Sequence, residues 1–219
     1  MRVLSKEEDG LLLRPENPEL LKANSGGTTP GQVDFYKERA TNNIFLESSK
    51  EQDARVKANS PFRNLRTWKL MKILVKSNDD VRQEAFAMQM INQMDQIWQM
   101  CKCNLWIKSY EIIATGHMCG LMEFVSDSLS IHGIKEKLGP NSTLVDYFRR
   151  QFGKPSYTRY KKAVENFTSS LAAYSLVCYI LQIKDRHNGN ILMDIEGHIV
   201  HIDFGFLLSN APGKGVSME

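Results

Sequence analysis

Two short segments near the end of the sequence place two aspartates and an asparagine at spacings that could support chemistry on a phosphate group. Residues 184–190 read K-D-R-H-N-G-N, and residues 201–205 read H-I-D-F-G. Asp185 and Asn190 are five residues apart, and Asp203 follows Asn190 by thirteen. Carboxylate and amide oxygens bind divalent cations, and a carboxylate can also accept a proton from a hydroxyl.

The residues between these segments are expected to form a β-hairpin. Residues 191–193 and 198–202 are mainly apolar, and D-I-E-G at 194–197 is typical of a turn. Such a hairpin would bring Asn190 and Asp203 to the same end of two paired strands. There the two side chains could share one cation.

The combined pattern matches the protein-kinase template except in one detail. In that template an aspartate faces the hydroxyl being phosphorylated, an asparagine holds a metal ion, and the aspartate of Asp-Phe-Gly holds Mg²⁺. Asp-Phe-Gly alone is a common tripeptide, but together with the upstream Asp and Asn it favours ATP-dependent phosphoryl transfer. Protein kinases write their loop His-Arg-Asp, whereas residues 185–187 read Asp-Arg-His.

The inverted order resembles the catalytic loop of the phosphatidylinositol 3- and 4-kinases and of their large protein-kinase relatives. Residues 73–84 read I-L-V-K-S-N-D-D-V-R-Q-E and are similar to the V-K-x-x-D-D-L-R-Q segment of that family. Details at residues 130–132, 174–182 and 197–203 resemble the 4-kinases, the type III beta group first and the type III alpha group second. The resemblance covers roughly residues 55–219.

This resemblance implies a lipid kinase that transfers the γ-phosphate of ATP to the 4-hydroxyl of phosphatidylinositol, in phosphoinositide signalling and membrane traffic. The implied partners are ATP, Mg²⁺ (with Mn²⁺ as the alternative metal) and phosphatidylinositol in a membrane surface, without nucleic acid. The implied location is cytoplasmic and peripheral on Golgi-like endomembranes. A phosphatidylinositol 3-kinase, a related protein kinase, or a truncated fragment that only binds nucleotide are the alternatives.

The resemblance assigns four residues to catalysis. Asn190 and Asp203 are expected to hold the metal ion, while Asp185 and His187 share the removal of the hydroxyl proton. A histidine titrates close to neutral pH, which suits a general base. Asp185 could orient the histidine or act as the base itself, and the sequence leaves both choices open.

Lys76 is the candidate for contacting the ATP phosphates, and Glu84 is the candidate for pairing with it. Residues 67–76 alternate between apolar and polar side chains and predict a strand that ends at Lys76. Glu84 lies in the first turns of the helix expected after Asp80. In kinases a strand lysine contacts phosphate and pairs with a helix glutamate. The alternative is a solvated lysine and an exposed glutamate.

Position within the family suggests three further contacts with ATP. Residues 60–64 read S-P-F-R-N and occupy the place of the phosphate-covering loop, although they contain no glycine. Ser60 is therefore expected either to touch phosphate or to lie in a plain surface turn. Residues 119–125 are expected to form a strand and the hinge, where the backbone of Glu123 and Val125 would hydrogen-bond adenine.

The predicted fold is α+β, with the two lobes of a protein-kinase-like architecture. Residues 1–54 are expected to be a mostly disordered linker, and residues 55–125 an N-lobe of antiparallel sheet plus helix. Residues 126–219 are expected to form a partial, mainly helical C-lobe, truncated after the start of the activation segment. Strands are also expected at 105–107 and 110–114, and helices at 142–151 and 159–183.

Composition argues against several other classes of protein. A net charge of +3 is too small to indicate a nucleic-acid partner. The four cysteines form no paired CxxC arrangement, so a reducing compartment is expected. The apolar run at 171–181 is shorter than the ~20 residues that a membrane span requires. We therefore expect no transmembrane segment.

Overall fold

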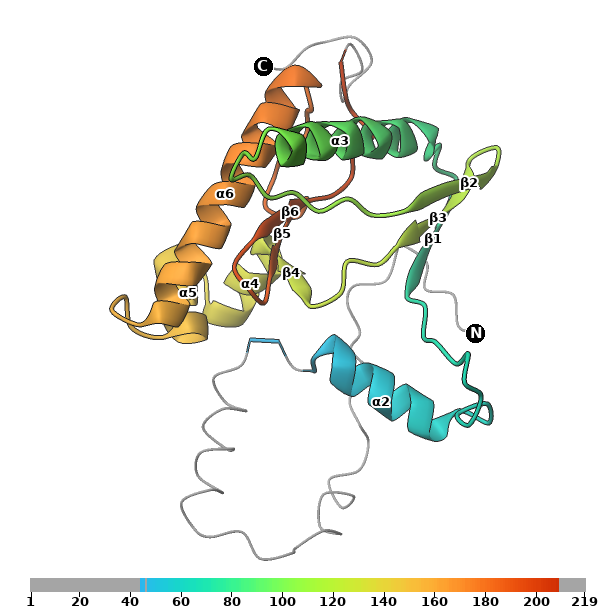
Figure 1. Cartoon of the computed structure of the whole chain (residues 1–219), viewed down its shortest axis with the longest axis horizontal. Coiled ribbons are helices and arrows are strands. Elements are labelled where there is room, and N and C mark those ends of the chain that lie inside the picture. The colour runs from blue at the N-terminus through green and yellow to red at the C-terminus, as the bar shows by residue number, and fades with distance from the viewer. Residues whose placement is uncertain (1–43, 46, 209–219) are drawn as a thin grey trace, which may run out of the picture.

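The structure, a computed structural model, describes residues 44–45 and 47–208. It combines helices with two three-stranded sheets, so the fold is α+β as predicted (Figure 1). In chain order the elements are α2 (Ser49–Asn59), β1 (Ile73–Ser77), α3 (Arg82–Met100), β2 (Ile112–Gly116), β3 (Cys119–Glu123), β4 (Ser128–Ser130), α4 (Ile131–Leu138), α5 (Leu144–Phe152), α6 (Thr158–Ile180), β5 (Ile191–Asp194) and β6 (Ile199–His201).

The first sheet has the strand order β1-β3-β2 and is antiparallel throughout. Lys76 on β1 lies opposite Gly120 on β3. A Cβ atom on Gly120 would lie 2.3 Å from Cγ2 of Val81, the residue that precedes α3. The absence of a side chain at Gly120 therefore lets the start of α3 lie directly on β3, close to Lys76.

The second sheet, β4-β5-β6, contains the predicted hairpin. β5 and β6 pair antiparallel, with Ile191 opposite His201. The ladder continues by one hydrogen bond, from the Ile202 N–H to the Asn190 carbonyl at 3.0 Å. The prediction that the hairpin brings Asn190 and Asp203 to the same end is therefore confirmed.

Helix α6 lies beside this hairpin (Figure 1). Polar and aromatic side chains connect the two. The Ser170 hydroxyl accepts a hydrogen bond from the Ile199 N–H at 3.0 Å. Asn166 Nδ2 donates to the Glu196 carbonyl at 2.9 Å. The ring of Tyr174 stacks on His201 with 4.5 Å between ring centroids. Side chains from α3, α6 and the hairpin then join in one buried core.

Two predicted strands differ from the structure. The strand expected at 67–76 is shorter in the structure and begins only at Ile73, the first residue of β1. Before it, residues 60–68 form turns whose hydrogen bonds join residues three apart. Residues 105–107 are not a strand, since Trp106 stacks on His198 with 3.8 Å between ring centroids. This segment crosses the hairpin instead of pairing with the first sheet.

The predicted linker boundary at residue 54 is wrong, because it falls inside α2. Ser48 begins this helix with a capping box that involves Glu51. Contacts with Asp127 and Lys72 then hold the helix to the rest of the fold: the Ser49 N–H donates to Asp127 Oδ1 at 2.6 Å, and Lys72 Nζ donates to the Ser49 hydroxyl at 2.5 Å and pairs with Asp53 at 3.0 Å. The remaining linker, residues 1–43, and the end of the chain, 209–219, lie outside the described residues.

Helix α4 and strand β4 were not predicted, because each is too short for a clear periodic pattern. The predicted helices at 142–151 and 159–183 correspond to α5 and α6. Within the described part of the chain, no helix combines the length and apolar character that crossing a bilayer requires.

The turn of the hairpin offers a test of how tightly it packs on α6. Gly197 has φ +95°, and a Cβ there would lie 2.9 Å from the Ala163 carbonyl oxygen. Gly139 has φ +103° with no atom within 4 Å of such a Cβ. We expect Gly197→Ala to lower the free energy of unfolding by about 3 kcal/mol and Gly139→Ala by about 1 kcal/mol. Urea denaturation measures both, and equal losses would contradict this packing.

Candidate active site

Lys76 and Glu84 form a buried ion pair between β1 and the first turn of α3. Lys76 Nζ lies 2.5 Å from Glu84 Oε1 and 3.2 Å from Asp79 Oδ2. Glu84 is only 2% exposed. The predicted pair therefore forms, and neither side chain is simply solvated.

The charges around this pair extend to Asp203. Burial alone lowers the pKa of Lys76, but Glu84, Asp203 and Asp79 together outweigh it and leave the pKa of Lys76 raised. Burial raises the pKa of Glu84, and Lys76 opposes that shift. The ammonium group of Lys76 is thus charged at neutral pH and lies within electrostatic reach of the Asp203 carboxylate.

Asn190 and Asp203 are oriented by the backbone around them. Asn190 is 8% exposed, and its Nδ2 donates to the Asp185 carbonyl at 3.1 Å. This bond leaves Asn190 Oδ1 without a hydrogen-bond donor among the described residues. Asp203 has φ +63°, a left-handed conformation that is uncommon for residues other than glycine. Two oxygen-bearing side chains thus lie at one end of the hairpin.

Arg186 connects the two loops that carry the candidate carboxylates. Its guanidinium donates to three backbone carbonyls: Lys184 at 3.0 Å, Ile202 at 2.8 Å, and Asp203. It also lies over the Phe204 ring, 5.5 Å from the centroid. These bonds hold the peptide that precedes Asp185 and the peptide that follows Asp203 at a fixed separation.

This connection was not foreseen from the sequence, and it explains an unusual backbone. Asp185 has φ +57° and Asp203 has φ +63°, and each such conformation costs on the order of 1–3 kcal/mol. Hydrogen bonds from a charged donor are stronger than neutral ones and can offset this cost. Burial lowers the pKa of Arg186, yet an arginine remains charged at any physiological pH.

His187 and Asp185 are neighbours, but the histidine is held by its own loop. His187 Nδ1 accepts a hydrogen bond from the Gly189 N–H at 3.0 Å, and its Nε2 lies 4.0 Å from Asp185 Oδ2. A Cβ on Gly189 would lie 2.9 Å from His187 Cε1, so a side chain there would displace the ring from this position. In the neutral imidazole an accepting Nδ1 places the proton on Nε2, facing Asp185.

Tyr110 is a residue of this region that sequence reasoning missed. It is 5% exposed, and its hydroxyl has no hydrogen-bond partner among the described residues. Glu84 Oε2 is likewise buried without a partner. Burial raises the pKa of Tyr110 well above its ordinary value, and the nearby charges of Glu84 and Asp203 act in the same direction. A buried hydroxyl rarely stays unpaired, so it marks a place where a ligand could bind.

The hinge residues present one open backbone donor. The Glu123 N–H donates to the Glu111 carbonyl at 2.8 Å, and the Val125 carbonyl accepts from the Ser128 hydroxyl at 2.8 Å. The Val125 N–H has no acceptor within the described ranges. Of the two predicted hinge positions, Val125 therefore has the N–H available to a ligand.

Ser60 is not brought into this cluster by any contact between described residues. It follows the last turn of α2, and its hydroxyl accepts hydrogen bonds from the Phe62 N–H at 3.2 Å and from Trp68 Nε1 at 3.1 Å. Both bonds use the hydroxyl oxygen as the acceptor, so the O–H of Ser60 could still donate to a phosphate oxygen. That contact stays a prediction.

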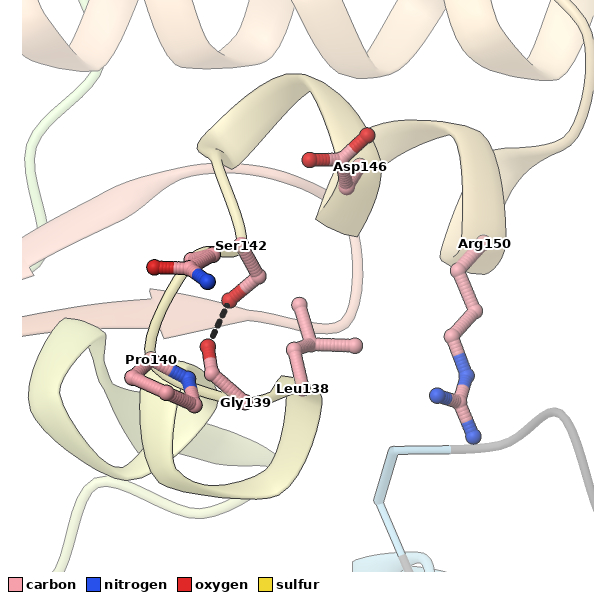
Figure 2. A pocket seen from close by; sticks show the side chains of 7 residues that line it. Leu138, Gly139, Pro140, Ser142, Asp146 and Arg150 are labelled. Atoms are coloured by element: carbon pink, nitrogen blue, oxygen red, sulfur yellow. Dashed lines mark hydrogen bonds between the residues drawn. The ribbon is translucent and has the colours of Figure 1, made fainter.

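One cavity lies apart from these residues. It has a volume of about 520 Å³ and is lined by Leu138, Gly139, Pro140, Asn141, Ser142, Asp146 and Arg150 (Figure 2). The Ser142 hydroxyl donates to the Gly139 carbonyl at 2.6 Å and closes the loop between α4 and α5. None of the predicted site residues lines this cavity.

Comparison with known proteins identifies a family. Residues 70–216 match the family described as phosphatidylinositol 3- and 4-kinase. The chain is 44% identical over 205 residues to a phosphatidylinositol 4-kinase of Dictyostelium discoideum. It is 49% identical over 165 residues to phosphatidylinositol 4-kinase beta 2 of Arabidopsis thaliana. It is 44% identical over 166 residues to phosphatidylinositol 4-kinase beta of Sorex araneus.

These relatives are much longer proteins. The matches cover 94%, 75% and 76% of this chain in the order given. They cover only 16%, 15% and 20% of the relatives' own lengths.

The role of Arg186 can be separated from ordinary packing by a matched pair of substitutions. Arg159 also lies over a phenylalanine ring, 5.6 Å from the centroid of Phe152, but it donates to no carbonyl in the described structure. We expect Arg186→Met to lower the free energy of unfolding by about 3 kcal/mol, since three partly buried carbonyls lose their donor. Arg159→Met is expected to cost less than about 1 kcal/mol. Similar losses in urea denaturation would refute the connecting role of Arg186.

Proposed function

Because the chain belongs to the phosphatidylinositol 3- and 4-kinase family, we propose that it transfers the γ-phosphate of ATP to the 4-hydroxyl of phosphatidylinositol. The observation that carries the proposal is the approach of the Lys76–Glu84 pair to Asp203, with Asn190 at the same end of the hairpin. A buried cation beside two oxygen-bearing side chains suits a phosphate chain and its metal ion. The 4-position follows from the relatives, which are named phosphatidylinositol 4-kinases.

The two-lobed interpretation of the fold belongs to this proposal. The sheet β1-β3-β2 with α3 would be the N-lobe, residues 55–125. The second sheet with α4, α5 and α6 would be the described part of the C-lobe, which begins at residue 126. The pairing of Lys76 with Glu84 supports this division, since kinases bring these two residue types together within the N-lobe.

ATP would bind between the two sheets. Lys76 Nζ would contact the phosphates, held in place by Glu84. The free N–H of Val125 and the backbone of Glu123 would hydrogen-bond the adenine. The Ser60 O–H would donate to a phosphate oxygen while its oxygen keeps the bonds from Phe62 and Trp68.

Asn190 and Asp203 fit a magnesium ion. Mg²⁺ prefers oxygen ligands and is usually bound through one or two protein oxygens, with substrate phosphates and water completing its octahedron. Asn190 Oδ1 and the Asp203 carboxylate supply that number of ligands. Among the described residues, no group of three or more His, Cys, Asp or Glu side chains could hold a metal alone. A bound Mg²⁺ would neutralise charge on the transferred phosphate.

Asp185 is the better candidate for the base. His187 Nδ1 already accepts a hydrogen bond from Gly189, and its Nε2 would carry the proton. The Asp185 carboxylate is 40% exposed and can accept the proton of the inositol hydroxyl. His187 would then stabilise the carboxylate from the 4.0 Å position of its Nε2.

Location and substrate presentation complete the proposal. A kinase that acts on phosphatidylinositol must work at a membrane surface, so the chain would be a peripheral protein of the cytoplasmic face. Golgi-like endomembranes are the compartment that the family resemblance implies.

The test is transfer of labelled phosphate from Mg-ATP to phosphatidylinositol vesicles, with the product regioisomers separated. We expect the 4-phosphate, and we expect Asp203→Ala to lower the rate at least ~100-fold because a metal ligand is lost. Lys76→Met should weaken ATP binding at least ~10-fold, since a desolvated charge contact with phosphate disappears.

Asp95→Ala serves as the control, because Asp95 is partly exposed on α3 and, among the described residues, bonds only to Gln99. A 3-phosphate product would indicate a phosphatidylinositol 3-kinase. Label found on protein alone would indicate a related protein kinase. ATP binding without transfer in the unmodified chain would contradict catalysis and support a nucleotide-binding fragment.

A further inference from the structure

A second cavity lies beside the turn of the hairpin and contains none of the residues placed in the active site. It is lined by residues 104–106, by Lys162, Glu165, Asn166 and Ser169 of α6, and by His198. Its volume is about 180 Å³, whereas a cavity of roughly 150 Å³ can already hold a benzene molecule. The cavity therefore has room for a small organic group.

This cavity is remote from the proposed ATP site, although it lies on the same hairpin. Asn190 and Asp203 lie at one end of strands β5 and β6, and the turn that precedes His198 lies at the other. The four residues of β5 separate the two ends by roughly 13 Å, at about 3.3 Å per residue. A ligand in this cavity would therefore leave the ATP site open.

His198 is one of two buried polar side chains that line the cavity. It is 6% exposed, and the Trp106 ring stacks on it. Its Nδ1 lies 2.9 Å from Asp194 Oδ2, and Nδ1 carries the proton because an ionised carboxylate only accepts hydrogen bonds. Its Nε2 has no hydrogen-bond partner among the described residues. The neutral ring therefore offers the lone pair of Nε2 to a ligand.

Asn166 is the other buried polar side chain of the cavity. It is 9% exposed, and its Nδ2 donates to the Glu196 carbonyl at 2.9 Å. This bond fixes the orientation of the amide, because Oδ1 cannot bond to a carbonyl oxygen. Oδ1 then has no donor within the described ranges. Two buried acceptors without donors thus line one cavity, and buried polar atoms are normally paired with protein, water or a ligand.

The rim of the cavity adds a carboxylate and a hydroxyl oxygen. The Glu165 side chain is 70% exposed, and its Oε2 lies 3.6 Å from Nζ of Lys162, which is 68% exposed. The Ser169 hydroxyl donates to the Asn166 carbonyl at 3.1 Å, so toward a ligand its oxygen is an acceptor. The buried part of the cavity thus presents acceptors, and a negative charge lies at its entrance.

We propose that this cavity binds a guanidinium group. A guanidinium is planar, has five N–H donors and no acceptor, and stays charged at any physiological pH. Its donors bond to His198 Nε2 and Asn166 Oδ1, while its charge faces Glu165. The spread of its donors suits acceptors that come from different elements, whereas an ammonium carries its donors around one point. An anion would meet two acceptors and be repelled.

Titration of the full chain with ethylguanidinium, followed by NMR of the indole N–H signals, tests the proposal. The chain has three tryptophans, Trp68, Trp98 and Trp106, and the variants Trp68→Phe and Trp98→Phe assign the signals. We expect the Trp106 signal alone to move, with a dissociation constant on the order of 1 mM for so small a ligand. No movement, or equal movement of all three signals, would overturn the proposal.

Tetramethylammonium separates hydrogen bonding from charge, since it is a cation without N–H donors. We expect it to bind at least ~10-fold more weakly than ethylguanidinium, because the bonds to two buried acceptors are lost. Equal binding of the two cations would contradict a role for His198 and Asn166. Displacement of ethylguanidinium by inorganic phosphate would contradict a cation site.

Two substitutions at the rim should act in opposite directions. Glu165→Gln removes the carboxylate and should weaken ethylguanidinium binding about threefold, while Lys162→Ala removes a like charge and should strengthen it about threefold. Glu136→Gln and Lys161→Ala change exposed residues of the same types outside the cavity and should leave binding unchanged. The reverse signs at Glu165 and Lys162 would show an anion site and refute the proposal.

A guanidinium group can come from an arginine of a partner protein or from a small free compound, and the blocked peptide acetyl-Gly-Arg-Gly-amide separates these sources. Binding of the peptide at least as tight as that of ethylguanidinium supports the site and assigns it to a protein arginine. Binding of ethylguanidinium with weaker or no binding of the peptide supports the site and assigns it to a free compound. Because no ATP is present, none of these results depends on whether the chain transfers phosphate.

Discussion

The separation between the two carboxylate-bearing loops depends on one side chain, Arg186. Its three bonds to carbonyls join the loop after α6 to the end of the hairpin. These bonds support two residues with a left-handed backbone, Asp185 and Asp203. Because Arg186 donates to carbonyls and not to a carboxylate, it fixes the two loops without occupying the side chain of either aspartate.

The rest of the site depends on bringing the first sheet to this rigid unit. Lys76 reaches Asp203 electrostatically only because α3 lies on β3 and shares a core with α6 and the hairpin. The result is an alternation of charge, from Glu84 through Lys76 to Asp203. A phosphate chain with a bound metal ion carries the opposite alternation, so such a ligand would meet complementary charge at each step.

The sequence was sufficient where a feature has a side-chain pattern. The apolar segments on either side of D-I-E-G predicted the hairpin, and the family resemblance around Lys76 and Glu84 predicted their pair. The sequence was insufficient where backbone groups are the partners. The bonds of Arg186 to carbonyls, the free N–H of Val125 and the cap of α2 have no counterpart in side-chain spacing. Tyr110 was missed because an unpaired buried hydroxyl becomes visible only in three dimensions.

The segment before β1 shows that a sequence pattern can mislead when it is compared only with the two-residue period of a strand and the 3.6-residue period of an α-helix. Residues 67–76 were interpreted with the two-residue period of a strand, yet a three-residue repeat extends through Lys72 and coincides with the hydrogen-bonded turns. The strand begins at Ile73, where that repeat ends. A period of three fits neither a strand nor an α-helix, and it places every apolar side chain beside a basic one on the same side of successive turns. That arrangement buries little within the protein, and Phe62, Leu65 and Met71 are accordingly exposed.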